Sequence, residues 1–264
     1  MNKWLERSIE LAQNKNYLDK LQEIYKLPSN KPRELDKDKW DVVIKNYKKR
    51  DNIGLIKSLL ELDLFPIKHS FVAYFRRDPS SMSRNPKTVF EVSKILYDLG
   101  IEGIKISCKE AKETNRQIGP LFKNYLRDAD LNIAKYNHSN FLSTNENALY
   151  MGSDDGSKRY AAEKLGYRRN KGLDFLAKIN GKHIIGEAKF LTDFGGHQNA
   201  QLDDAYSTLK ASVRNTEKIL ILDGVLYIAN SGKMYQTITQ EFKNENIMSA
   251  VLIKGYIMEK INEA

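Results

Sequence analysis

Apolar residues recur at helical spacing through the first half of the chain. Between residues 2 and 27 the pattern predicts a pair of helices, which Pro28 stops. Further helices are predicted over 36–49, 52–62 and 86–99. The last of these follows Asn85-Pro86 and is closed by Gly100. No pair of strands is predicted before about residue 130, so the N-terminal half is expected to be helical.

The pattern changes after Gly156, where strand-like runs alternate with helices. The predicted order is a helix to about Leu165, two short alternating runs around Asn180-Gly181, a helix over about 198–213, and apolar runs at 219–222 and 225–229 on either side of Asp223-Gly224. We therefore expect an α/β (α+β) protein in which a helical region, residues 1–135, precedes a core, residues 136–264, with a mixed β-sheet flanked by helices. No low-complexity linker separates the halves, so a single core shared by both is the alternative.

The most informative stretch is a predicted hairpin. Asn-Gly between alternating runs favours a two-residue type I′ turn, because both central residues of that turn need positive φ. If Asn180-Gly181 is the turn, Ile179 pairs with Lys182, and the same register places Asp174 opposite Glu187. Opposed Cβ atoms lie about 4.5–5.5 Å apart, and like charges there destabilise a sheet unless a cation sits between them. A divalent metal ion is the natural occupant.

Alternation along the same strand brings a lysine to this pair of carboxylates. Lys189 lies two residues after Glu187 and therefore on the same face. Hydrolysis of a phosphodiester needs neutralisation of phosphoryl charge, a positioned water and help for the leaving oxygen. Two carboxylates that hold Mg²⁺, together with a lysine, supply these needs, although solvated charges on a surface hairpin would give the same bare pattern.

Charge and composition narrow the class of partner. The 264 residues are 41% hydrophobic and 29% charged, which is typical of a globular protein with a sizeable core. The net charge of +9 favours an anionic macromolecule, with nucleic acid first. A single cysteine, Cys108, suits a reducing compartment, and neither a secretion signal nor a membrane span is predicted. We expect a cytoplasmic protein.

The arrangement of Asp174 followed by Glu187-Ala188-Lys189 after a glycine-turn hairpin resembles the PD-(D/E)XK nuclease superfamily, which includes most type II restriction endonucleases. The resemblance covers about residues 155–210. It implies that Asp174, Glu187 and the Ala188 carbonyl hold Mg²⁺ and that Lys189 is the catalytic lysine. Leu173 stands where the superfamily name has proline. A further acidic residue is common before the first strand of such proteins, and Asp155 or Glu163 are the candidates.

Three segments offer side chains of the types that contact DNA. The candidates are Arg76, Arg77 and Arg84; Asn115, Arg116 and Gln117; and Gly195, Gly196, His197, Gln198, Asn199 and Gln201. Arginine, asparagine and glutamine read base edges in the major groove, and a glycine-rich turn at a helix start presents N–H groups to phosphate. The alternative for the arginines is a solvated charged face, and for the glycine turn an ordinary helix start.

The resemblance implies a type II restriction endonuclease that cleaves double-stranded DNA with Mg²⁺ and leaves 5′-phosphate and 3′-hydroxyl ends. A homodimer would give each strand its own catalytic residues, and the family implies a cognate DNA methyltransferase in the same system. Two alternatives stay open. One is a structure-specific endonuclease resembling Holliday-junction resolvases, and the other is a DNA-binding regulator without catalysis.

Overall fold

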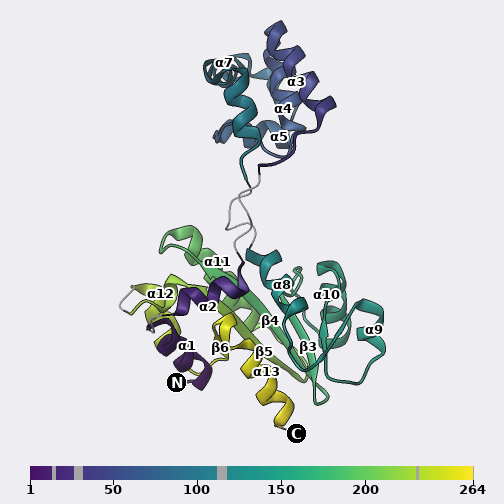
Figure 1. Cartoon of the computed structure of the whole chain (residues 1–264), viewed down its shortest axis with the longest axis vertical. Helices are drawn as coiled ribbons and strands as arrows, with labels where there is room; N and C mark the ends of the chain where they lie inside the picture. The colour runs from purple at the N-terminus through teal and green to yellow at the C-terminus, as the bar shows by residue number, and fades with distance from the viewer. Residues whose placement is uncertain (14–15, 27–31, 112–117, 230–231, 264) are drawn as a thin grey trace. The chain divides into compact units, whose positions relative to one another are not determined.

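The computed structural model describes residues 1–13, 16–26, 32–111, 118–229 and 232–263 (Figure 1). The chain divides into two compact units: residues 1–27 with 114–264 form the first, and residues 28–113 form the second. This division corrects the predicted boundary near residue 135. Buried residues such as Trp4 and Phe122 belong to the same hydrophobic core as the sheet, so both ends of the expected helical region fold with the core.

The first unit is built on a mixed sheet, as predicted, and the sheet has six strands. Its strands are β1 (Ala134–Tyr136), β2 (Ala148–Tyr150), β3 (Phe175–Ile179), β4 (Lys182–Leu191), β5 (Thr216–Gly224) and β6 (Ile247–Met248), in spatial order β1-β2-β3-β4-β5-β6. The β2-β3 and β3-β4 pairs are antiparallel and the other neighbours are parallel. The fold class is therefore confirmed as α+β, with a central mixed sheet.

Helices surround this sheet. They are α1 (Lys3–Gln13), α2 (Tyr17–Ile24), α8 (Ile118–Asp128), α9 (His138–Ser143), α10 (Asp154–Tyr160), α11 (Gly196–Lys210), α12 (Lys233–Gln236) and α13 (Ile253–Asn262), with a π-helical turn over Ala161–Leu165. The apolar run predicted at 225–229 is not a strand, because Val225–Tyr227 forms a short 3₁₀ turn. Gly224 precedes it with φ +101°, and a Cβ there would meet the Leu191 carbonyl oxygen.

Alternate residues of the hairpin face two hydrophobic cores. Ala177 and Ile184 belong to a core that includes α1, α2, α11 and α13, whereas Leu176 and Ile185 belong to a core that includes α9 and α10. This follows from the two-residue period of a strand. Because both faces are covered, polar side chains on β4 are taken out of water unless they lie near its end.

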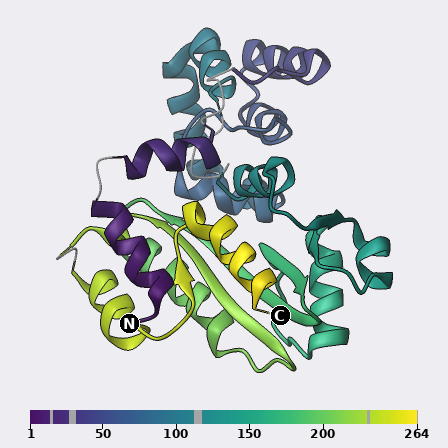
Figure 2. The ribbon, with the colours of Figure 1, turned by 60° about the horizontal axis from the view of Figure 1, so that its bottom comes forward.

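The two ends of the chain pack together within the first unit. In Figure 2, α1 (purple) and α13 (yellow) lie over the strands, and the ring of Trp4 meets that of Tyr256 edge-on at 5.5 Å. None of the described helices is both long and apolar enough to cross a bilayer.

A buried carboxylate ties α2 to the sheet. Asp223, at the end of β5, is fully buried and accepts hydrogen bonds from the hydroxyls of Tyr17 and Tyr25, at 3.0 and 2.8 Å. The Ser249 hydroxyl and the Ala250 amide also donate to it, at 2.6 and 3.1 Å. Burial raises the pKa of Asp223 to about 6, although these four donors oppose the rise.

The second unit is helical. Its helices are α3 (Lys37–Lys49), α4 (Asn52–Leu60), α5 (Ser70–Arg77), α6 (Ser81–Arg84) and α7 (Pro86–Cys108). Asp36 and Asp51 cap the first two, because their carboxylates accept hydrogen bonds from the Lys39 and Gly54 amides. Gly100 interrupts the helix where the sequence placed its end, but helical structure resumes to Cys108. Cys108 is buried in the core of this unit, so its thiol has a packing role.

Candidate active site

The hairpin has the register that the sequence predicted. Ile179 pairs with Lys182 and Phe175 with Gly186, and Asn180 and Gly181 have φ +49° and +73°. A type I′ turn needs positive φ at both of these positions. The last pair of the ladder is Phe175 with Gly186. Asp174 lies one residue before β3, and continuing the register places it opposite Glu187.

Asp174 is fixed by the backbone of β4. Its Oδ2 accepts a hydrogen bond from the Ala188 amide at 3.0 Å. Burial, and then the charge of Glu187, raise the pKa of Asp174 to about 6, although the Ala188 amide, Lys189 and Lys171 oppose the rise. The two carboxylates therefore repel each other in a poorly hydrated place.

Glu187 is fully buried and shared by two ammonium groups. Its Oε1 accepts hydrogen bonds from Lys171 and, at 2.6 Å, from Lys189. Its Oε2 is buried and has no hydrogen-bond partner among the described residues. A buried carboxylate with one oxygen unpaired is strongly unfavourable unless a cation or donor reaches it.

Sequence reasoning missed three residues that complete this arrangement. Asp204 on α11 accepts a hydrogen bond from Lys171 at 2.5 Å and lies 3.8 Å from the Lys189 ammonium. Arg169 in turn donates to Asp204 at 2.5 Å. Opposite charges therefore alternate along Glu187, Lys171, Asp204 and Arg169. No sequence spacing links α11 to the hairpin, so this series of ion pairs could be identified only from the tertiary structure.

These interactions shift the pKa values of Lys171 and Asp204 in the directions that keep both groups charged. Burial lowers the pKa of Lys171, but hydrogen bonds to Asp204 and Glu187 outweigh that effect and leave it raised. Burial raises the pKa of Asp204, but the hydrogen bonds from Lys171 and Arg169 outweigh that effect and leave the pKa lowered. Both groups are ionised at neutral pH.

The donor set fits a hard cation such as Mg²⁺. The unpaired Glu187 Oε2 and the repulsion between Asp174 and Glu187 are both relieved by a positive charge between them. In an extended strand the N–H and C=O of one residue point to the same side, so the Ala188 carbonyl also faces Asp174. In the described part of the chain, no three His, Cys, Asp or Glu side chains converge as metal ligands. A set of two carboxylates and a carbonyl leaves room for the waters that Mg²⁺ retains.

A cavity of about 440 Å³ opens beside these groups. Asp174, Lys189 and Asp204 line it together with His197 and Gln201 of α11. The start of α11 was a predicted DNA-contact segment, so the structure brings part of that segment to the hairpin. His197 and Gln201 also contact each other through Nε2 atoms 3.1 Å apart.

The other residues of that segment lie in the exposed turn before α11 and in its first turn. Gly195 precedes the helix and Gly196 begins it. Gln198 exchanges hydrogen bonds with Thr192, both at 3.3 Å, and Asn199 donates to the Phe194 carbonyl. Asp155 and Glu163, the candidate further acids, are exposed and take no part in the contacts described around Glu187. Asp204 is the additional carboxylate that the structure brings to the site.

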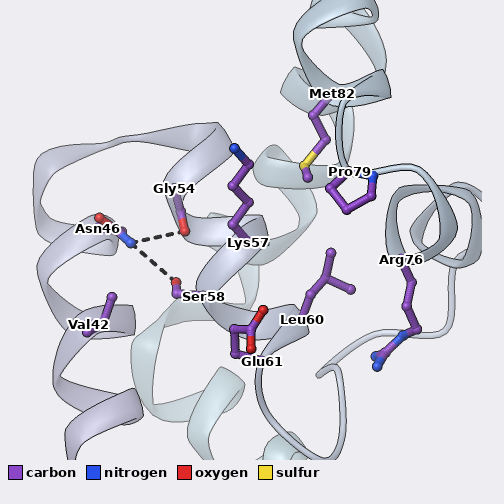
Figure 3. Close-up of a pocket in the computed structure, with 10 residues that line it drawn as sticks. All are labelled: Val42, Asn46, Gly54, Lys57, Ser58, Leu60, Glu61, Arg76, Pro79 and Met82. Carbon is purple, nitrogen blue, oxygen red and sulfur yellow. Dashed lines mark hydrogen bonds between the residues drawn. The ribbon is translucent and has the colours of Figure 1, made fainter.

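The predicted arginines of the second unit lie on α5 and α6. Arg76 and Arg77 are exposed, and Arg76 lines a cavity of about 560 Å³ together with Lys57 and Glu61 (Figure 3). Arg84 is held by Asp78 at 2.6 Å and by the Ser80 hydroxyl at 2.8 Å. Asn115, Arg116 and Gln117 lie outside the described residues.

Comparison with known proteins identifies the family. No curated protein and no solved structure gave a significant match. A family of restriction enzymes matches over residues 2–260, which include both units and every candidate site residue described above. The chain belongs to the Tsp45I type II restriction enzyme family.

Proposed function

We propose that this protein is a Mg²⁺-dependent endonuclease that hydrolyses double-stranded DNA at a specific site, with the β3-β4 hairpin as its catalytic centre. The observation that carries the proposal is that Asp174 and Lys189 line one cavity, while Glu187, which accepts a hydrogen bond from Lys189, keeps its other oxygen buried and unpaired among the described residues. Membership of a restriction enzyme family supports DNA as the substrate. The products are 5′-phosphate and 3′-hydroxyl ends, as the PD-(D/E)XK resemblance implies.

Each residue of the site has a separate role in this proposal. Asp174, Glu187 and the Ala188 carbonyl would hold Mg²⁺, which supplies neutralisation of the charge that develops on the phosphoryl oxygens. Lys189 lines the cavity and orients the attacking water by its ammonium charge. Lys171 donates to the same oxygen of Glu187 as Lys189 does, and Asp204 and Arg169 fix its position. These last three are positioning residues.

Specific cleavage also needs contacts outside the hairpin. We assign phosphate and base contacts to the start of α11 and to Arg76 and Arg77 of the second unit, whose exposed guanidiniums suit both. Two copies of the chain would cleave the two strands of a symmetric site. A methyltransferase that protects the same sequence is the companion activity that a restriction system requires.

The test is cleavage of a mixed-sequence plasmid by the full-length protein, with Mg²⁺ and with EDTA. Discrete fragments that require Mg²⁺, and that disappear in both Asp174→Ala and Lys189→Ala, are expected. Lys123→Ala is the matched control, because Lys123 forms an ion pair with Asp154 away from the cavity. Cleavage that survives in Asp174→Ala would contradict the assignment, and cutting only at branched DNA would favour a structure-specific endonuclease.

A further inference from the structure

A second basic cavity lies in the first unit, away from the hairpin carboxylates. It is formed where the π-helical turn Ala161–Leu165 ends and where α11 leads into β5, and it measures about 520 Å³. Three arginines line it, Arg168, Arg169 and Arg214, and none of the described residues around it is acidic. The Ser212 hydroxyl adds a neutral donor. The charged side chains that line the cavity are therefore all cationic.

Two of the three guanidiniums are electrically unbalanced. Arg169 is neutralised, since it donates to Asp204 at 2.5 Å and to the Thr208 hydroxyl at 2.8 Å. For Arg168 and Arg214, no ion pair with a carboxylate occurs within the described part of the chain. Gly166 leaves space beside Arg214, because a Cβ at this position would stand 3.9 Å from its Nε.

Helix ends do not account for this charge. The π-helical turn ends at Leu165 and α11 ends at Lys210, and arginines are common at such ends because the last carbonyls carry partial negative charge. Each end is equivalent to roughly half an elementary charge, so two ends offset only about one of the two unpaired guanidiniums. A net positive charge of about one remains for a ligand.

We propose that this cavity binds a phosphodiester group of the DNA substrate, outside the catalytic site. The proposal rests on the proposed nuclease function. Guanidinium forks match phosphate oxygens in two-point contacts, and the Ser212 hydroxyl can donate a third hydrogen bond. No aromatic ring is among the described lining residues, so nothing there stacks on a base. The chemistry therefore suits a backbone phosphate rather than a whole nucleotide.

The position of the cavity suits a duplex that also reaches the hairpin. From Asp204 to its end at Lys210, α11 rises about 9 Å. Phosphates of one DNA strand follow each other at about 3.4 Å along the duplex axis, so for a duplex whose axis runs along α11 this rise corresponds to roughly three nucleotides. Arg169 lines the cavity and is also the last member of the series of charges that leads through Asp204 and Lys171 to Glu187.

The experiment measures DNA binding at several salt concentrations, in EDTA so that the duplex stays intact. The double variant Arg168→Ala with Arg214→Ala is compared with wild type and with Lys233→Ala combined with Lys254→Ala, which removes the same charge from exposed lysines elsewhere in this unit. In the arginine variant the dissociation constant should rise about tenfold. The slope of log affinity against log salt should become less negative by about 0.9 for each phosphate that the variant no longer neutralises.

The outcomes separate this proposal from the nuclease function. If wild type binds and cleaves DNA but the arginine variant behaves like the lysine control, the cavity is not a phosphate site and the nuclease assignment stands. If wild type neither binds nor cleaves DNA, both proposals fail. If inorganic phosphate at constant ionic strength raises the melting midpoint of wild type only, while DNA affinity is equal in both proteins, the ligand is a free anion and the DNA assignment is overturned.

Discussion

At the scale of single residues, the main feature is that buried Glu187 is held by two ammonium groups rather than one. Lys189 was identified from the strand period, but Lys171 and Asp204 come from other elements. Removing one partner of a buried carboxylate leaves its charge less compensated, whereas exposed ion pairs contribute little to stability. The two kinds of ion pair can therefore be distinguished by mutation.

Lys171→Met is expected to lower the free energy of unfolding by about 1–3 kcal/mol in EDTA. Mg²⁺ should raise the melting midpoint more in this variant than in wild type, because the ion no longer shares Glu187 with the Lys171 ammonium. Thermal denaturation with EDTA and with Mg²⁺ measures both effects. Lys123→Met, at the exposed pair with Asp154, is the control and should change stability by less than about 1 kcal/mol. Equal midpoints for the two variants in EDTA would refute this account of Lys171.

Asp223 gives a pH-dependent prediction. Its pKa in the folded protein is about 6, above the ordinary value of 3.8, so folding favours the protonated form. Its contribution is fully present below about pH 4 and is lost as the pH rises through 6, by about 3 kcal/mol in total. Urea unfolding from pH 4 to 7 should therefore show Asp223→Asn gaining stability relative to wild type. For Asp155→Asn, at an exposed carboxyl, the free energy of unfolding should change with pH as it does in wild type. The same pH dependence in Asp223→Asn would disprove the raised pKa of Asp223.

At the scale of elements, the turn of the β3-β4 hairpin sets the register that brings Asp174 to Glu187. Gly181 has φ +73° and nothing within 4 Å of a Cβ added to it, so a substitution there meets only backbone strain. Gly181→Ala should lower stability by about 1–2 kcal/mol, the cost of the left-handed region for an L-residue. Gly196→Ala also enters open space but without positive φ, and serves as the control in the same denaturation experiment. Equal stabilities would show that the turn tolerates a side chain.

At the scale of the whole molecule, we expect the first unit to hold the catalytic residues and the second unit to contribute to DNA binding. The carboxylates and lysines of the site belong to the first unit, and Arg76 and Arg77 to the second. Arg76→Ala with Arg77→Ala should weaken DNA binding about tenfold while the Mg²⁺-dependent rise in melting midpoint stays at its wild-type value. Lys37→Ala with Lys94→Ala removes equal charge from exposed positions of the same unit. If both pairs weaken binding alike, the effect is one of net charge and not of α5.

The sequence by itself determined the local features of this protein. Hydrophobic periodicity predicted most helices, and Asn180-Gly181 with the alternation around it fixed the hairpin register, because a turn and its flanking strands are adjacent in the chain. From these the positions of Asp174, Glu187 and Lys189 followed. The tertiary structure decided the rest. Residues 1–27 fold with the sheet, and Lys171 links Glu187 to Asp204, which Arg169 holds in turn, through contacts between separate elements that no local pattern encodes.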